Sequence, residues 1–285
     1  MECRSLTRVI RILPVTVFYV SETKFDNYKD KIMKSTNLTL IAALTFAFAT
    51  MGAPVAQAQD APPAAAAEPV PDNQISYNVG VVSDYRYRGI SQTRLKPALQ
   101  GGVDYVNNPT GLYVGTWASS IKWIKDAGGD DNVEVDIYAG KRGEITKDFT
   151  YDVGGLYYLY PSNGLTPSAN TFELYAQIGS GPFSLKYSHS TTNLFGFADS
   201  KNSGYVDAQF NQDVYDGYTL NLHAGHQNVK HNGASSYSDY KVGFTKDFGV
   251  ATVALAAVFT NTDAYVGRGK NLGKTGAVLT ISKTF

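Results

Sequence analysis

The sequence predicts an all-β protein, an antiparallel transmembrane β-barrel of about twelve strands that occupies residues 75–285. Three observations predict this fold. Apolar and polar residues alternate along one segment after another, short and long connections alternate between these segments, and the last segment is an alternating strand that ends in Phe285. Period two is typical of a strand with one apolar and one polar face, and single-chain outer-membrane barrels have an even number of strands.

The alternation is clearest where Val133, Val135 and Ile137 alternate with Glu134 and Asp136. From residue 75 onward, no stretch has a convincing helical period. Most of the segments have the roughly 9–11 residues that a tilted strand needs to cross a bilayer. The predicted strands are residues 75–85, 97–106, 112–121, 132–143, 149–160, 171–180, 183–193, 205–212, 218–229, 238–248, 250–261 and 275–285.

The connections between these segments alternate strictly between long and short. The short ones are residues 107–111, 143–148, 180–182, 211–217 and 249. The long ones are residues 86–96, 122–131, 161–170, 194–204, 230–237 and 262–274. Short periplasmic turns and longer outside loops are typical of a barrel with both ends of its chain in the periplasm.

Composition agrees with strands and turns, and it excludes some classes of protein. The chain has 20 Tyr and 27 Gly, and 18% of its residues are charged, against a usual value of about 25%. A net charge of zero argues against a nucleic-acid partner, which normally meets a basic face. The single cysteine, Cys3, excludes a disulfide framework and a cysteine-based metal site.

Tyrosine and tryptophan gather at the ends of the predicted strands. Amphipathic rings suit the depth of lipid headgroups, so this distribution predicts aromatic girdles, whereas the ordinary strand propensity of tyrosine is the alternative. The girdle candidates are Tyr85, Tyr87, Tyr105, Tyr113, Trp117, Trp123, Tyr157, Tyr158, Tyr160, Tyr205, Tyr215 and Tyr218.

Three segments precede the predicted barrel. Residues 33–58 are expected to be a signal peptide, with a positive start, an apolar core too short to span a membrane as a helix and a cleavage site near Ala58; a short membrane anchor is the alternative. Residues 1–32 are interpreted as an upstream extension from a mis-assigned start or as an extended signal region. The Ala/Pro-rich residues 59–74 are expected to form a disordered linker.

The final predicted strand carries Ala277, Leu279 and Ile281 on the same face as Phe285, although Lys283 interrupts the apolar pattern. This ending resembles the sorting signal of outer-membrane barrels. We therefore expect the barrel-assembly machinery to be a partner through Phe285.

A family resemblance is carried mainly by "YNVGVVSDYRYRGISQT" at residues 77–93, with weaker agreement at 97–105, 111–121, 133–143 and 151–161. This block resembles the opening motif of the TorF-like porin family of bacterial outer-membrane proteins. The resemblance implies the outer membrane of a Gram-negative bacterium and a pore. It supplies no established substrate and no functional residues that could be carried over.

Arg86 and Arg88 are the strongest candidates for a constriction inside the barrel. They share a face at the outer end of the first predicted strand, where they could project inward and attract anions. Alternatively, they could pair with barrel acids such as Asp104 or Asp136. The polar faces of the strands supply the other candidates for the lumen, since charge on the lipid face costs a few kcal/mol. These are Asp104, Glu134, Asp136, Asp152, Glu173, Lys186, Asp207 and Lys241.

We expect no cofactor and no metal site. His223 and His226 lie on opposite faces of one predicted strand, and the glycine-rich residues 267–276 lack the spacing and the following helix of a phosphate-binding loop.

The predicted function is passive diffusion of small solutes or ions through the lumen, without enzymatic chemistry and with the oligomeric state left open. Outer-membrane lipid and the permeating solutes are the expected partners. A non-conducting barrel with a structural or adhesive role is one alternative. Another is an enzyme acting on lipid, which would need a Ser/His or acid/His set at the outer rim. A soluble lipocalin-like barrel is the third.

Overall fold

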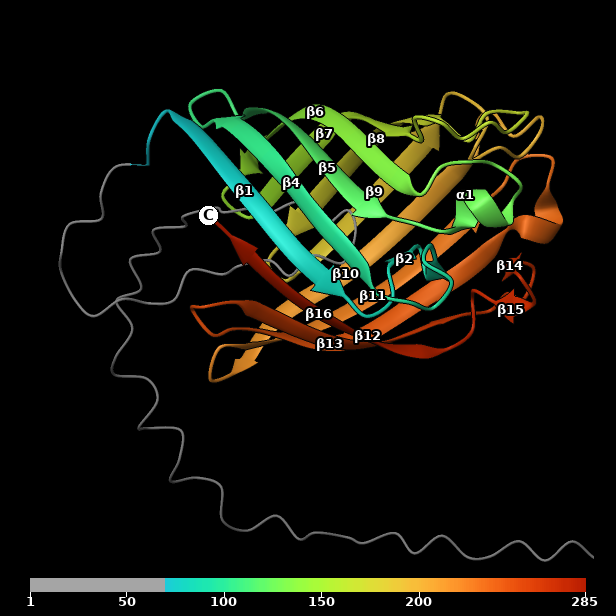
Figure 1. Ribbon diagram of the computed structural model, residues 1–285. Helices are drawn as coiled ribbons and strands as arrows, with labels where there is room; N and C mark the ends of the chain where they lie inside the picture. The colour runs from blue at the N-terminus through green and yellow to red at the C-terminus, as the bar shows by residue number, and fades with distance from the viewer. Residues whose placement is uncertain (1–69) are drawn as a thin grey trace, which may run out of the picture. The chain divides into compact units, whose positions relative to one another are not determined.

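The computed structural model describes residues 70–285, where twelve strands form a closed antiparallel barrel (Figure 1). The all-β barrel prediction is therefore confirmed. The predicted upstream extension, the signal peptide and most of the linker lie outside the described residues. The barrel strands are β1 (Asn73–Val82), β4 (Ala98–Asn107), β5 (Leu112–Ser120), β6 (Val133–Thr146), β7 (Phe149–Leu159), β8 (Thr171–Ser180), β9 (Phe183–Ser190), β10 (Gly204–Tyr215), β11 (Tyr218–Asn228), β12 (Tyr237–Asp247), β13 (Thr252–Thr260) and β16 (Gly276–Thr284).

The barrel closes between its first and last strands. β1 pairs with β16 in a register that places Val81 opposite Ile281, and Tyr77 and Phe285 exchange backbone hydrogen bonds of 3.0 and 2.8 Å. Every barrel strand therefore has two neighbours, which satisfies backbone groups that an open edge would leave unpaired.

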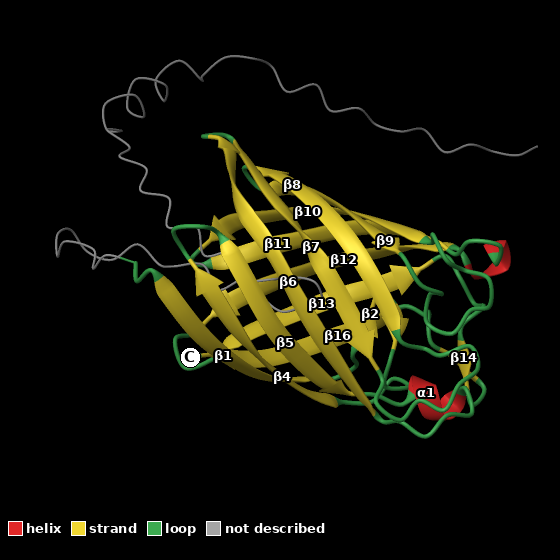
Figure 2. Ribbon diagram, turned by 90° about the horizontal axis from the view of Figure 1, so that it is seen from above, coloured by secondary structure: helices red, strands yellow, loops and turns green. Residues whose placement is uncertain are grey.

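The short and long connections lie at opposite ends of the barrel. The C-terminus and the short turns gather at one end, and the long loops gather at the other (Figures 1 and 2). The turn between β10 and β11 has only two residues outside the strands, Asp216 and Gly217, with φ of 47° and 71°. Positive φ at both residues gives the tight turn whose twist matches antiparallel strands.

The long loops contain small elements of their own. β2 (Arg86–Tyr87) pairs with β3 (Ile90–Ser91), and β14 (Val266–Gly267) pairs with β15 (Lys270–Asn271). The helices α1 (Trp123–Asp126) and η2 (Gly233–Ser235) are one turn each. Within residues 70–285, no helix is long and apolar enough to cross a membrane.

The two faces of the barrel wall have opposite chemistry. Along β1, Val79 and Val81 are 47% and 51% exposed on the outside, whereas Val82 is 5% exposed on the inside. The same alternation runs along the other strands, so an apolar outer face surrounds an interior of tyrosines, carboxylates and amines. This arrangement is the reverse of a water-soluble protein, in which the interior is the apolar side.

The girdle prediction is wrong for most of the tyrosines and tryptophans named above. Tyr105, Tyr157, Tyr215 and Tyr218 occupy outward positions of their strands. Of the others, Tyr113, Trp117, Tyr158 and Tyr205 face inward, and Tyr85, Tyr87, Trp123 and Tyr160 lie in the long connections between barrel strands. The inward rings are large enough to fill the lumen beside β5–β8. The interior makes room for them with glycine, because a Cβ at Gly140 would lie 2.2 Å from the Tyr113 hydroxyl and one at Gly154 would lie 2.5 Å from that of Tyr175.

Candidate constriction site

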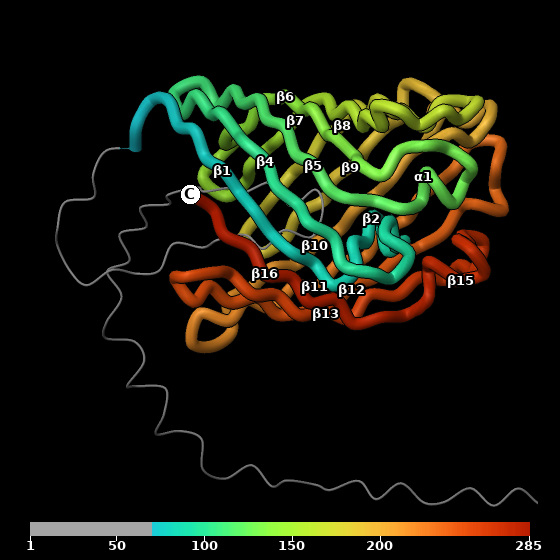
Figure 3. Tube along the Cα trace, in the orientation of Figure 1, coloured from blue at the N-terminus to red at the C-terminus, as the bar shows by residue number. Residues whose placement is uncertain are grey.

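The loop between β1 and β4 folds into the barrel instead of extending the first strand. The chain turns inward after Val82, where the Asp84 carboxylate accepts hydrogen bonds from Ser91 Oγ at 2.5 Å, Arg86 Nε at 2.7 Å and Thr93 Oγ1 at 3.3 Å. These bonds tie residues 84–93 into a compact hairpin, which can be traced in Figure 3 at the label β2. The prediction that the first strand continues to residue 85 is therefore wrong.

Residues 84–91, here named the constriction segment, reach the wall on several sides. The Tyr85 hydroxyl donates to Glu134 on β6 at 2.6 Å, and the Tyr87 hydroxyl lies 2.8 Å from that of Tyr158 on β7. Gly89 packs against β12 and β13, since a Cβ there would lie 2.7 Å from Asp239 Cβ and 2.6 Å from Thr260 Cγ2. The segment therefore crosses the lumen from one wall to another.

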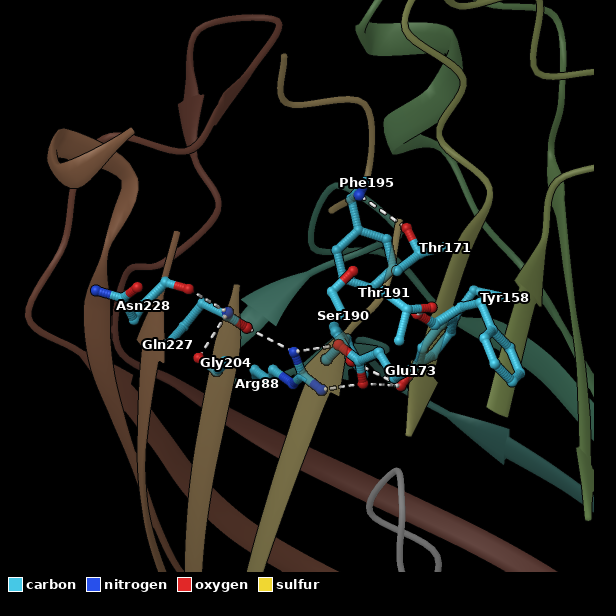
Figure 4. Close-up of polar contacts among 12 residues, drawn as sticks. Arg88, Tyr158, Thr171, Glu173, Ser190, Thr191, Phe195, Gly204, Gln227 and Asn228 are labelled. Atoms are coloured by element: carbon cyan, nitrogen blue, oxygen red, sulfur yellow. Dashed lines mark hydrogen bonds and ion pairs between the residues drawn. The ribbon is translucent and has the colours of Figure 1, made fainter. Parts of the chain in front are cut away.

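Arg88 forms the central contact of this segment (Figure 4). Its Nη2 and Nη1 donate to the two carboxylate oxygens of Glu173 at 2.7 and 3.1 Å, and Nη1 also donates to Gln227 Oε1 at 2.5 Å. The guanidinium carbon lies 4.2 Å from the centre of the Tyr205 ring. The forked geometry is the strongest form of an arginine–carboxylate pair.

The Arg88–Glu173 pair is buried, with side-chain exposures of 6% and 3%. Burial lowers the pKa of Arg88, but the Glu173 carboxylate opposes it, so the pKa lies well above its ordinary value and the guanidinium stays charged. Arg88 also has a φ of 46°, a left-handed conformation that is uncommon outside glycine. Its contacts on β8 and β11 hold the side chain across the lumen.

Arg86 has a different task from Arg88. It donates to Asp84, to the Gly89 carbonyl at 3.1 Å and to the Lys274 carbonyl at 2.7 Å, so it fastens the segment to the loop before β16. Both arginines pair with acids, as the alternative to an anion-attracting constriction predicts, but the partners are Asp84 and Glu173 and the suggested examples Asp104 and Asp136 are wrong. The hairpin brings Asp84 to Arg86, and the left-handed turn at Arg88 directs that side chain to Glu173.

Two cavities lie on either side of the constriction segment. The outer cavity, of about 410 Å³, is lined by aromatic residues of the long loops, including Trp123, Phe195 and Tyr265. The inner cavity, of about 160 Å³, is lined by residues of β9–β13 and β16. Tyr87 lines both, so the two cavities meet at the constriction segment.

Five of the predicted lumen acids lie inside the barrel but outside the lining of the inner cavity: Glu173, which pairs with Arg88, and Asp104, Glu134, Asp136 and Asp152. The Tyr138 hydroxyl donates to Asp104 at 2.5 Å and Tyr113 to Asp152 at 2.6 Å. Glu134 accepts from Tyr85 and from Tyr160, the latter at 2.8 Å. Asp136 is 4% exposed, and its Oδ1 has no hydrogen-bond partner among the described residues. The tyrosine-filled side of the lumen therefore holds carboxylates capped mainly by hydroxyl groups.

The remaining predicted residues, Lys186, Asp207 and Lys241, line the inner cavity together with His223 and Asp239. His223 lies between two carboxylates, with Nδ1 2.9 Å from Asp207 and Nε2 2.6 Å from Asp239. Both ring nitrogens can donate only in the imidazolium form. Sequence reasoning missed Asp239, although its position two residues before Lys241 places it on the same inward face.

His226 faces outward, on the opposite face of β11 from His223, as predicted. Its Nδ1 lies 3.0 Å from Ser238 Oγ, and the two residues are directly opposite each other on β11 and β12. Within residues 70–285, no carboxylate is hydrogen-bonded to the other ring nitrogen of His226. The contact is therefore a Ser–His pair without the acid that orients the base in a catalytic triad.

A closed barrel with an apolar exterior and a polar lumen has the architecture of an antiparallel transmembrane β-barrel. Residues 66–285 match the family described as bacterial protein of unknown function (Gcw_chp). The chain belongs to this family.

Three solved structures align with the chain at low similarity. Pseudomonas aeruginosa OprD aligns with a TM-score of 0.36 and 10% identity over 74% of this chain and 66% of its own. Acinetobacter baumannii OccAB2 aligns with a TM-score of 0.35 and 11% identity over 77% and 66%, so this chain spans just under two thirds of either protein. A mutant of the Rh. blastica porin aligns with a TM-score of 0.33 and 10% identity over 75% and 100%. No curated protein matches the sequence.

Proposed function

We propose that the protein is an outer-membrane channel through which small solutes or ions diffuse passively, with the constriction segment setting the size and rate of what passes. The observation that carries this proposal is the constriction segment, which the Arg88–Glu173 pair holds in the lumen of a closed barrel and whose Tyr87 lines a cavity on each side. Pore diameter and the charges at its narrowest point decide selectivity in such channels. The TorF-like porin resemblance and the apolar outer face support the same proposal.

Single-channel conductance in planar bilayers tests the proposal. We expect the folded wild-type protein to give small conductance steps, and Arg88→Ala to give larger ones because the side chain that spans the lumen is removed. Arg268→Ala is the matched control, since that side chain is 69% exposed in an outer loop. Folded protein that inserts but gives no steps in either form would overturn the channel.

A non-conducting barrel is the second candidate, because the constriction segment contacts several sides of the wall. In that case Arg88→Ala would give no conductance steps, although protease protection of the barrel shows that the protein has inserted into the bilayer. Outer-membrane lipid and the barrel-assembly machinery would remain its partners, the latter through Phe285, and the structural or adhesive role would replace transport.

We also propose that the protein has no enzymatic activity on lipid. The outward Ser238–His226 pair is the arrangement that such an enzyme would need, but a nucleophile of this kind depends on an oriented base. We expect no fatty acid release from phospholipid vesicles that contain the barrel. Hydrolysis that disappears in Ser238→Ala, but not in the inward control Ser188→Ala, would overturn this proposal.

A further inference from the structure

The inner cavity has an excess of positive charge, because most of the acids in the lumen lie on its tyrosine-filled side whereas Lys186 and Lys241 line the cavity. Its charged lining comprises four Lys or Arg residues and three Asp residues, in addition to His223. Asp104, Glu134, Asp136, Asp152 and Glu173 are absent from that lining, although Glu173 pairs with Arg88 and offsets one of the four cations. The side of the barrel that remains open therefore favours anions, although the interior as a whole contains more acids than bases.

Lys241 is the amine that this arrangement leaves available. Arg86 and Arg88 are held by Asp84 and Glu173, and the Lys186 ammonium lies 4.0 Å from the centre of the Tyr175 ring. Lys241 is half-buried on the wall of the cavity. Among residues 70–285, it has no hydrogen bond and no ion pair.

The acids nearest to Lys241 are already occupied. Asp239 accepts hydrogen bonds from His223 and, at 2.9 Å, from the Tyr205 hydroxyl. Asp207 accepts hydrogen bonds from His223 and, at 2.9 Å, from the side-chain amide of Gln209. His223 itself is directly opposite Lys241 across β11 and β12, so a second cation adjoins the ammonium. The two carboxylates and two cations of this group balance in number, so Lys241 differs from the rest only in that its ammonium donates no hydrogen bond to a described residue and can donate one to an entering anion.

The other neighbours of Lys241 are small and apolar. Val258 is directly opposite it across β12 and β13. Ala256, two residues before Val258 on the same inward face, and Val278, opposite Ala256 on β16, also line the cavity. A solute that satisfies both surfaces carries a single negative group attached to a short aliphatic chain.

We propose that the inner cavity binds short-chain aliphatic carboxylates, with the Lys241 ammonium receiving the carboxylate while Val258, Ala256 and Val278 contact the chain. This inference rests on the proposed channel for its role in transport, but binding can be measured without conductance. The inner cavity, next to the constriction segment, is then the place where the channel selects organic anions.

Selectivity is measured by the reversal potential of the reconstituted protein in a gradient of potassium butyrate. We expect the wild type to prefer butyrate over potassium and Lys241→Gln to reduce the permeability ratio about fivefold, as removal of one charge at close range implies. Lys246→Gln is the matched control, because Lys246 lies on the outer face of the same strand and pairs with Asp216 at 2.8 Å. The control is expected to keep the wild-type ratio.

Binding is measured separately by acetylation of the folded full-length protein, followed by peptide mass spectrometry. We expect millimolar butyrate to slow acetylation of Lys241 but not of Lys246 or the exposed Lys230, and n-butylammonium to give no protection. Conductance without a butyrate preference and without protection overturns the carboxylate site but leaves the channel intact. Protection of Lys241 in a protein that never conducts overturns the channel and leaves the site.

Discussion

The guanidinium of Arg88 and the carboxylate of Glu173 form a forked ion pair that joins an inward loop to β8 near the loop end of the barrel wall, with both side chains nearly inaccessible to solvent. Removal of one partner from a buried pair leaves an uncompensated charge, which costs about 3 kcal/mol or more, whereas removal of both costs far less. Single and double substitutions of this pair are therefore expected to differ clearly in how much they lower the free energy of unfolding.

Glu173→Gln is expected to lower the free energy of unfolding by about 3 kcal/mol, because Arg88 stays charged without its carboxylate. Arg88→Met combined with Glu173→Gln is expected to recover most of that loss. The measurement is urea unfolding in lipid vesicles, followed by the heat-dependent shift of the barrel on gels. Equal losses in the single and double variants would show that the charge of Arg88 is already satisfied elsewhere.

Gly89→Ala is expected to displace the constriction segment. Gly89 has a φ of 79°, and its Cβ would come within 2.7 Å of side-chain atoms of Asp239 and Thr260. Gly269→Ala is the control, because Gly269 has a φ of 77° with nothing within 4 Å and so carries only the backbone cost of about 1 kcal/mol. We expect larger conductance steps from Gly89→Ala alone. Wild-type steps from both variants would mean that the segment does not limit passage.

The strands were predictable because period two is a local property of the chain. All twelve predicted strands are present, and their boundaries shift by at most a few residues, for example from 183–193 to Phe183–Ser190. Turn chemistry such as Asp216–Gly217 is equally local. The inward path of the loop after Val82 was not predictable, because it depends on contacts of Asp84 with Ser91 and Thr93 that alternation does not encode.

Partners inside the lumen were also beyond prediction. Alternation assigns Glu173 and Asp136 to the same interior, but only the closed barrel decides which strand faces Arg88 across the lumen. The tyrosines were misinterpreted for a related reason. Tyr113 and Tyr158 have the same strand propensity on either face, and the glycines that make room for inward rings, such as Gly140, lie on neighbouring strands.

Ile137→Lys tests whether the outer face contacts lipid. Ile137 is 46% exposed on the outside of β6, and a lysine facing hydrocarbon costs about 2–4 kcal/mol near the bilayer midplane. Gln100→Lys is the control, since Gln100 lines the inner cavity. We expect Ile137→Lys to fold poorly into vesicles and the control to fold normally. A change below about 0.5 kcal/mol for Ile137→Lys, typical of a water-exposed surface, would support a soluble barrel.

Gly140→Ala is expected to destabilise the barrel by about 1–3 kcal/mol, the usual cost of overpacking. Its Cβ would lie 2.2 Å from the Tyr113 hydroxyl oxygen, 2.5 Å from the ring carbon that carries it and 2.6 Å from the Val153 carbonyl oxygen, and only the first of these contacts is removed by Tyr113→Phe. Tyr113→Phe removes that hydroxyl oxygen, together with its hydrogen bond to Asp152. If the close contact is the cause, the loss caused by Gly140→Ala is smaller when measured in Tyr113→Phe than in the wild type. Gly233→Ala, where nothing lies within 4 Å, is the control, and strictly additive losses at positions 113 and 140 would argue against this packing of the lumen.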